Sequence, residues 1–302
     1  MAHKSAIVVV GAGGRLGQAL VRSYSEEFAV TGFAHADLEL ARLGELDKIL
    51  AAQPFDLLIN AAALTNVDYC ENHLAEAMRA NAEAPRLMAD ICRQRGARFV
   101  HLSTDYVFDG QKHEPYTEED EPNPISVYGQ SKHEGEKQVL AVNPAALVLR
   151  VSWVFGPDRP SFVDAILEKA RHQEEVSAVA DKFSTPTYTR DIAALLRPLL
   201  EGEMPAGILH LANRGACSWQ EYAQWALDCC RRLGVVMKAT RIKPTSLSAM
   251  TSFIARRPIY SVLATEKFQR LTGRAPRAWQ DAVEEYVRTY FTSKDQPHVK
   301  QN

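Results

Sequence analysis

The sequence predicts an α/β fold, a doubly wound parallel sheet with a smaller C-terminal lobe. Residues 7–10 form a continuous β-branched run, which is typical of a strand buried on both faces. A glycine-rich turn follows at Gly11, Gly14 and Gly17, and further apolar runs then alternate with helical patterns. Such alternation requires right-handed crossovers, and therefore a parallel sheet with helices on both faces.

The alternation can be followed element by element. Short apolar runs predict strands at residues 29–33, 56–60, 98–103 and 146–150. Amphipathic patterns predict helices at residues 18–24, 46–52, 75–95, 131–142, 162–173, 191–200, 219–233, 265–271 and 278–291. Between them, residues 105–127 are rich in Gly, Pro and acids and predict a long surface loop. Loops of that length are commonly functional.

Composition narrows the class of partner. The chain has 302 residues, is 46% hydrophobic and carries a formal charge of −2, with Lys and Arg scattered along it. This balance argues against a nucleic-acid or anionic-membrane surface and favours a small-molecule partner. No stretch approaches the roughly 20 apolar residues of a membrane helix, and the run at residues 6–10 is too short for a signal peptide. We expect a cytoplasmic protein.

Cysteine usage gives no sign of a disulfide framework or a zinc site. There are five cysteines, an odd number, and none forms a Cys-x-x-Cys pair. The acids of the long loop also lack a regular ligand spacing. We therefore expect reduced thiols and no metal.

The glycine-rich turn, Gly11-Ala-Gly-Gly14-Arg15-Leu16-Gly17, predicts a Rossmann-type dinucleotide site. It follows a strand and opens a helix, which is the context that a dinucleotide site requires. Glycine permits the tight turn and the close approach of backbone to a pyrophosphate, whose charge then rests on the helix N-terminus. We expect a dinucleotide-binding domain at residues 1–156, with returning segments near 176–200, and a mainly substrate-binding lobe at 157–302.

Tyr128 and Lys132 lie four residues apart, so on a helix they share one face. A fixed cation beside a tyrosine lowers its pKa from about 10 towards the working range. Such a tyrosine can act as a general acid near neutral pH. The spacing alone is an ordinary one, and its meaning depends on its neighbours.

Those neighbours resemble the dTDP-4-dehydrorhamnose reductase family of extended short-chain dehydrogenases. The resemblance rests on four blocks: Asn60-Ala-Ala-Ala-Leu-Thr-Asn-Val-Asp-Tyr-Cys-Glu71, Ser103-Thr-Asp-Tyr-Val-Phe-Asp-Gly110, Val127-Tyr-Gly-Gln-Ser-Lys-His-Glu-Gly-Glu136 and Arg150-Val-Ser-Trp-Val-Phe-Gly156. It extends from about Ile7 to Phe291. The family reduces the C4 keto group of a nucleotide-activated 6-deoxysugar with a nicotinamide cofactor. It therefore implies a nucleotide-sugar substrate here.

The resemblance also implies roles for individual residues. Thr104 would bind the substrate carbonyl oxygen, Tyr128 would donate the proton, and Lys132 would hold the nicotinamide ribose and lower the pKa of Tyr128. The cofactor would contact Gly11, Gly14, Arg15, Leu16, Gly17, His35, Asn60, Ala61, Ala62, Ala63, Tyr128 and Lys132. Besides Thr104, the implied substrate contacts are Asp105, Tyr106, Trp153 and Arg257. Each of three substrate contacts has an equally good structural explanation. Asp105 could form a turn, Tyr106 could be a buried aromatic residue, and Trp153 could belong to the core.

Cofactor preference depends on the side chains directly after the second strand, where a base favours the NADP phosphate and an acid favours the NAD ribose. This chain has His35 near the position where many relatives carry Arg, and a histidine is only partly charged at neutral pH. Arg15 in the glycine turn could add positive charge. We lean slightly to NADPH, with NADH still open.

One departure from the family concerns assembly. Bacterial members that dimerise around magnesium carry a Glu shortly after the third glycine, where this chain has Ala19. A metal-bridged dimer is therefore not expected, while a homodimer of another kind stays open.

Two alternatives stay open beside the reductase. The regulatory beta subunit of methionine adenosyltransferase shares this fold and binds a cofactor as a partner protein. An extended-group epimerase or dehydratase is the other alternative, although Thr104-Asp105-Tyr106 lacks the Asp-Glu pair that dehydratases commonly carry beside the Thr.

Overall fold

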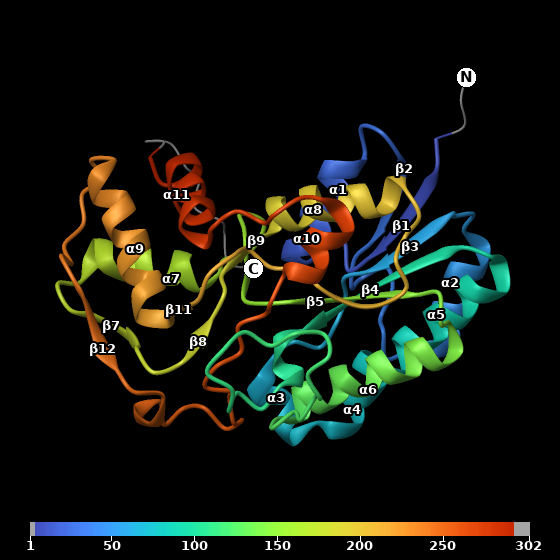
Figure 1. Ribbon diagram of the computed structural model, residues 1–302, viewed down its shortest axis with the longest axis horizontal. Coiled ribbons are helices and arrows are strands. Elements are labelled where there is room, and N and C mark those ends of the chain that lie inside the picture. The colour runs from blue at the N-terminus through green and yellow to red at the C-terminus, as the bar shows by residue number, and fades with distance from the viewer. Residues whose placement is uncertain (1–3, 293–302) are drawn as a thin grey trace.

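The β-branched run after residue 5 forms the first strand, β1, and the main sheet extends to both sides of it. The computed structural model describes residues 4–292 (Figure 1). The main sheet has six strands in the order β10-β5-β4-β3-β1-β2, and all neighbouring pairs are parallel. Its strands are β1 Ala6–Val10, β2 Ala29–Phe33, β3 Leu57–Asn60, β4 Arg98–Thr104, β5 Leu147–Val151 and β10 Gly207–His210.

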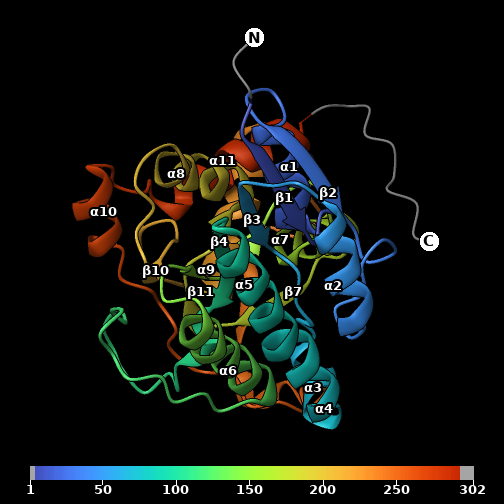
Figure 2. The ribbon, with the colours of Figure 1, turned by 90° about the vertical axis from the view of Figure 1, so that its right-hand side faces the viewer.

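Helices cover both faces of this sheet (Figure 2). Because successive side chains of a strand point to opposite faces, Ile7 and Val9 of β1 enter one core, and Val8 and Val10 enter the other. One face carries α1 Arg15–Tyr24 and α8 Thr189–Glu201. The other carries α2 Leu43–Ala52, α5 Ala84–Arg95 and α6 Val127–Val142. The predicted doubly wound α/β fold is confirmed.

The helix predicted at residues 75–95 is present, and one π-helical turn interrupts its α-helical pattern. The segment is α4 Leu74–Met78, a π-helical turn Arg79–Glu83 and then α5, preceded by the short helix α3 Val67–Asn72. Asn81, buried in the π turn, accepts from the Leu64 N–H and donates to the Ser131 hydroxyl. A π turn widens the backbone locally, and here it lets a polar side chain tie the helix to its neighbours.

The smaller lobe is built around an aromatic core. Phe155, Tyr188, Tyr222, Trp279 and Tyr286 are buried together there. Its helices are α7 Phe162–His172, α9 Trp219–Arg232 and α11 Trp279–Tyr290. Its short strands are β6 Val154–Phe155, β7 Val176–Val179, β8 Phe183–Ser184, β9 Thr187–Tyr188, β11 Cys217–Ser218 and β12 Ile242–Thr245.

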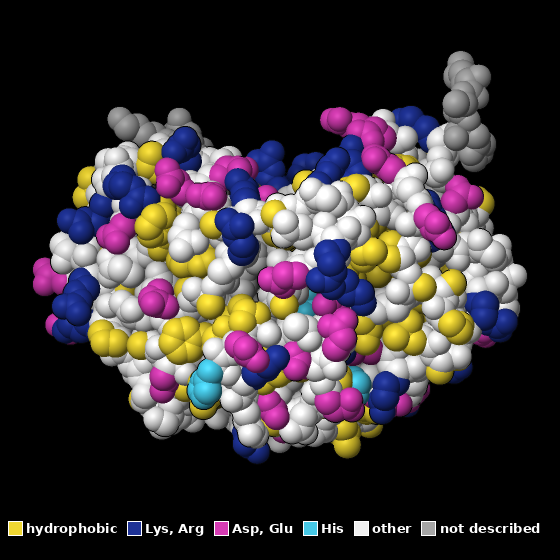
Figure 3. Space-filling model, in the orientation of Figure 1, with side chains coloured by type: hydrophobic (Ala, Val, Ile, Leu, Met, Phe, Trp, Pro, Cys, Tyr) yellow, Lys and Arg dark blue, Asp and Glu magenta, His cyan; other side chains and the backbone are white. Residues whose placement is uncertain are grey.

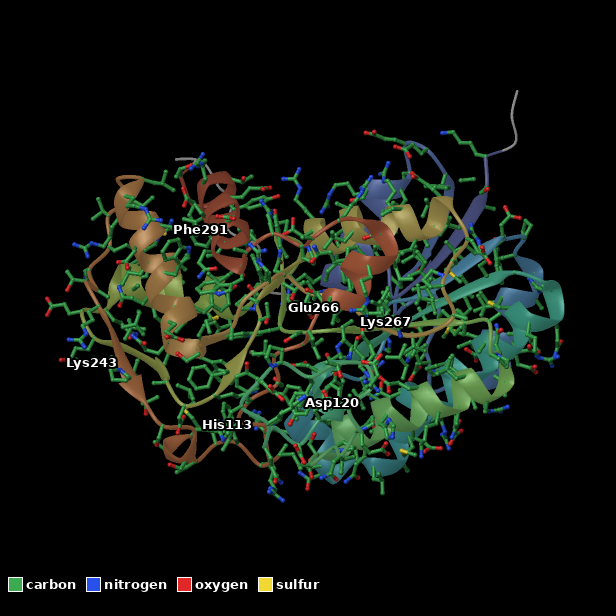
Figure 4. The ribbon with its side chains drawn as sticks, viewed as in Figure 1. His113, Asp120, Lys243, Glu266, Lys267 and Phe291 are labelled. Carbon is green, nitrogen blue, oxygen red and sulfur yellow. The ribbon has the colours of Figure 1, made fainter. Side chains whose placement is uncertain are left out.

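The chain crosses between the two parts more than once. Besides α8, both β10 and α10 Glu266–Thr272 lie with the main sheet, and Lys267 of α10 donates to the Ile208 carbonyl at 2.8 Å (Figure 4). The domain boundary at residue 156 remains a proposal, and residues 293–302 of the proposed lobe lie outside the described part of the chain.

Neither the surface charges nor the cysteines indicate a particular function. Charged side chains of both signs are interspersed over the face in Figure 3. All five cysteines are buried free thiols. Within residues 4–292, no helix is long and apolar enough to cross a membrane, and no group of three or more His, Cys, Asp or Glu side chains is placed to hold a metal.

Candidate active site

A cleft of about 900 Å³ opens at the carboxyl ends of the main-sheet strands, where the sheet meets the smaller lobe. It lies next to β1, from which the chain runs to β2 on one side and returns to β3 on the other. Ligands of open α/β sheets bind at such a switch point. Its lining includes these residues singled out from the sequence: Gly11, Gly14, Arg15, Leu16, His35, Ala61, Ala62, Ala63, Thr104, Asp105, Tyr106, Tyr128, Lys132 and Trp153.

The glycine turn brings backbone close to backbone. Gly11 has a φ of +87°, which suits glycine, and a Cβ there would lie 2.7 Å from the Ala62 nitrogen. Gly17 does not line the cleft, but a Cβ on it would lie 2.0 Å from the Gly11 carbonyl oxygen. The first turn of α1 has no side-chain cap and no acidic residue. Its amide groups therefore form an N-terminus suited to an anion.

Replacing Gly17 with alanine is expected to lower the free energy of unfolding by about 1–3 kcal/mol and to weaken dinucleotide binding, because the new methyl group would push Gly11 out of the turn. The matched control is Gly44→Ala in α2, where a Cβ would meet no atom within 4 Å. That variant should gain up to about 1 kcal/mol from helix propensity. Urea unfolding and cofactor titration measure both effects, and equal behaviour of the two variants would contradict the close packing.

Arg15 joins the glycine turn to the smaller lobe. Its guanidinium donates to the carbonyls of Val154, Arg159 and Pro160 at 2.6–3.2 Å. Arg159 in turn donates to the Gly13 carbonyl at 2.9 Å and lines the cleft. The sequence pattern did not single out Arg159, because an isolated arginine in a loop carries no spacing signal.

Tyr128 is placed by the start of α6. The Ser126 side chain caps that helix by accepting from the Gly129 N–H at 3.2 Å, and Tyr128 itself is only 9% exposed. Thr104 ends β4 and lines the same cleft. Burial raises the pKa of Tyr128, and the Thr104 hydroxyl acts in the opposite direction. Tyrosine already carries its hydrogen at neutral pH at its ordinary pKa of about 10, so burial does not change that state.

The expectation that Lys132 lowers the pKa of Tyr128 is wrong for this structure. The Lys132 ammonium nitrogen donates to the Leu102 carbonyl at 2.7 Å and lies 3.4 Å from Nε2 of His101. Burial lowers the pKa of Lys132 to about 8, while Glu136 acts to raise it. Lys132 is not among the groups that shift the pKa of Tyr128, and burial is the largest cause of the shift at both side chains.

Asp105 is a buried junction between the two parts of the molecule. It accepts hydrogen bonds from Thr104 at 3.2 Å, Ser152 at 3.0 Å and Ser261 at 2.6 Å. Burial raises its pKa, and the buried Lys182 opposes that rise. Asp105 therefore does more than form a turn, because its carboxylate also links β4 to Ser152 and Ser261. Neither Ser261 nor Lys182 was singled out, because both come from distant parts of the chain.

Aromatic side chains form the wall towards the smaller lobe. Tyr106 meets Tyr128 edge to face at 5.6 Å between ring centroids. Trp153 packs on Phe162 and Tyr222 and also lines the cleft, so it serves both as a core residue and as a wall of the site. Its φ of 39° is the one positive value among non-glycine residues within 4–292, and such strain is characteristic of functional sites.

Besides Gly17, two implied site residues lie away from the cleft lining. Arg257 makes a close ion pair with Asp68 at 2.6 Å and covers Phe253. Asn60 is fully buried at the end of β3, where it accepts from the Ala62 N–H at 3.1 Å and contacts His101. Direct contact of either residue with a ligand remains a prediction.

Comparisons with known proteins agree with this geometry. A family model described as the RmlD substrate binding domain matches residues 5–292. A dTDP-4-dehydrorhamnose reductase from Burkholderia thailandensis is 35% identical over 92% of this chain and 96% of that protein. The chain belongs to the dTDP-4-dehydrorhamnose reductase family.

Other members of the family differ in what their names assign to them. A Streptomyces antibioticus protein described as a probable dTDP-4,6-dihydroxy-2-methyloxan-3-one 4-ketoreductase is 39% identical, over 92% of this chain and 93% of that one. The crystal structure of a dTDP-4-dehydrorhamnose reductase from Bacillus anthracis in complex with NADP superposes with a TM-score of 0.88 and 30% identity, over 95% of this chain and 99% of that one. Family membership is thus clear, but the names of the relatives assign different sugar substrates to them.

Proposed function

We propose that this chain reduces the C4 keto group of a dTDP-4-keto-6-deoxyhexose with NADPH, and that the sugar is dTDP-4-dehydrorhamnose, giving dTDP-rhamnose. The observation that carries the proposal is that Thr104, Tyr128 and Lys132 line one cleft together with the glycine turn. A hydroxyl, a phenol and an amine next to a dinucleotide cradle suit carbonyl reduction. The relatives with reductase names support the same substrate class.

The cleft fits a nicotinamide dinucleotide. The uncapped start of α1 and the glycine turn suit a pyrophosphate, and His35 lines the cleft where it can reach an adenosine ribose or its phosphate. The NADP-bound relative supports NADPH as the preferred cofactor, with NADH as an alternative. NADPH, when bound, supplies the hydride.

The chain's own residues supply the proton and stabilise the charge. Tyr128, which carries its phenol hydrogen at neutral pH as any tyrosine with an ordinary pKa does, would give that hydrogen to the carbonyl oxygen that becomes the alcohol. Thr104, whose hydroxyl donates to Asp105 in this structure, would turn about its Cβ–Oγ1 bond to donate to the same oxygen. Two donors aimed at the same oxygen would stabilise the negative charge that develops on it. Lys132 would hold the nicotinamide ribose.

A cofactor-oxidation assay tests the function. The purified protein is given NADPH or NADH and a panel of nucleotide-activated 4-keto sugars, and the absorbance of the reduced cofactor is followed. We expect turnover with dTDP-4-dehydrorhamnose and a faster rate with NADPH. No turnover with any sugar would reject the proposal, and a stoichiometric complex with methionine adenosyltransferase in that case would favour the regulatory-subunit alternative. Turnover with another dTDP sugar alone would correct the substrate.

Two further expectations stand as proposals beside it. The chain would act in the cytoplasm, and any homodimer would form without a bridging metal, because Ala19 is buried in α1 and offers no ligand. Light scattering with and without a chelator tests the second expectation.

A further inference from the structure

Three polar side chains form a buried row below the cleft. Asn60 ends β3, His101 lies on the adjoining strand β4, and Lys132 reaches them from α6. The Asn60 amide nitrogen lies 3.1 Å from Nδ1 of His101, and Nε2 of the same ring lies 3.4 Å from Nζ of Lys132. All three side chains are at most 1% exposed. Hydrogen atoms in this row must therefore be shared among these groups, with no solvent to help.

The hydrogen bonds of Asn60 determine where the imidazole hydrogen lies. The Asn60 Oδ1 atom accepts from the Ala62 N–H at 3.1 Å, which leaves the amide nitrogen facing His101. An amide nitrogen only donates, so Nδ1 of His101 must accept. Burial lowers the pKa of His101 well below its usual range, so the ring is neutral. A neutral ring that accepts at Nδ1 carries its hydrogen on Nε2.

That hydrogen points at Lys132. An ammonium group has only donors, whereas a neutral amine has a lone pair that can accept. We propose that Asn60 holds His101 as the Nε2–H tautomer, and that His101 thereby favours the neutral amine of Lys132 over the ammonium. His101 is then a positioning residue that acts on the reaction through Lys132. The role of His101 in catalysis rests on the proposed function, whereas the tautomer of its ring does not depend on that function.

Burial and the charged Glu136 act on the pKa of Lys132 in opposite directions. Burial lowers the pKa of Lys132 to about 8, and Glu136, one turn further along α6, raises it. Arg150 of β5 holds Glu136 through two hydrogen bonds of 2.7 and 2.8 Å, which keeps that carboxylate charged and directed at Arg150. Leu102 accepts from Lys132 in either charge state. An N–H of His101 that points at Lys132 disfavours the ammonium, so it lowers the pKa of Lys132 in the same direction as burial.

Nitrogen NMR of the full-length protein tests the tautomer without any activity. Long-range ¹H–¹⁵N spectra distinguish the two neutral imidazole tautomers, and a His101→Gln variant identifies the signal by its loss. We expect the ring hydrogen on Nε2 and a ring that stays neutral well below pH 6.5, because desolvation holds its pKa low. A hydrogen on Nδ1, or a ring that titrates near pH 6.5, would overturn the proposal.

Substitutions at Asn60 test the effect on Lys132. In Asn60→Asp the carboxylate can only accept, so the ring should move its hydrogen to Nδ1 and present Nε2 as an acceptor to the ammonium. The pKa of Lys132, followed through its ¹³Cε shift, should then rise by about one unit or more. Asn60→Ser releases the tautomer without adding charge, so a smaller rise of the same sign is expected.

The matched control is Asn143→Asp. Asn143 is also a buried asparagine, donating to the Ala89 carbonyl at 3.2 Å, and it does not line the cleft. This variant should leave the Lys132 titration in place. If Asn60→Ser leaves the titration of Lys132 unchanged, the proposal fails even where Asn60→Asp shifts it, because the added charge alone would then explain the shift. If reduction is also measured, the alkaline limb of kcat/KM should move with the pKa of Lys132.

Discussion

Replacing Tyr128 with phenylalanine is expected to lower kcat for sugar reduction by about 10²–10⁴-fold while cofactor binding stays close to that of the unchanged protein. The substitution removes the phenol oxygen and, with it, the proton that Tyr128 is proposed to give to the reacting carbonyl. The ring itself stays packed edge to face against Tyr106. Steady-state kinetics and NADPH titration measure the two quantities separately.

Tyr24→Phe serves as the control for this prediction. Tyr24 is also a buried tyrosine, and its hydroxyl donates to the Ala193 carbonyl at 2.8 Å beneath the other face of the sheet. Losing that hydrogen bond should cost about 1 kcal/mol of stability and leave kcat unchanged. If the Tyr128 variant kept the kcat of the unchanged protein, another group would have to be the proton donor.

Glu136→Gln is expected to destabilise the fold by about 3–5 kcal/mol. Glu136 and Arg150 are each 1% exposed and share two hydrogen bonds. Removing the carboxylate charge leaves the Arg150 guanidinium buried without an anion, and that uncompensated charge is the source of the cost. Urea unfolding followed by circular dichroism measures the change.

Glu134→Gln, two residues earlier on the same helix, is the matched control. Glu134 pairs with Lys137 at the surface and is 29% exposed. Surface pairs contribute little, so we expect a change of at most about 1 kcal/mol. If both variants lost the same stability, the buried pair would not be the stronger contributor to the fold.

Lowering the pH should weaken the stabilising contribution of the Glu136–Arg150 pair. Burial alone would raise the pKa of Glu136, but hydrogen bonds from Arg150 and His133 outweigh burial and lower it to about 2, from an ordinary 4.5. A carboxylate whose pKa is lower in the folded state binds fewer protons there than in the unfolded state. Its contribution is therefore fully present above about pH 4.5 and is lost as the pH falls towards 2. In Glu136→Gln the unfolding free energy should depend less on pH across this window.

Much of the fold and part of the site could be predicted from local patterns. Strand runs such as residues 7–10 predicted buried strands, and the glycine turn predicted a helix start, because both depend on residues adjacent in sequence. The same locality brought Thr104, Tyr128 and Trp153 into the site through recognisable blocks. By contrast, the π turn at residues 79–83 places Asn81 against Ser131 of another helix, a contact that no local pattern reveals.

The sequence by itself determined the α/β class and the dinucleotide turn, since each depends on short-range spacing, and the family resemblance implied the roles proposed for Thr104 and Tyr128. Only the tertiary structure decided the charge states around them. Lys132 was expected to lower the pKa of Tyr128, but burial raises the pKa of Tyr128, and the Lys132 amine faces Leu102 and His101. Desolvation and the direction of a hydrogen bond depend on groups far apart in the chain, and these are known only once the strands and α6 have packed together.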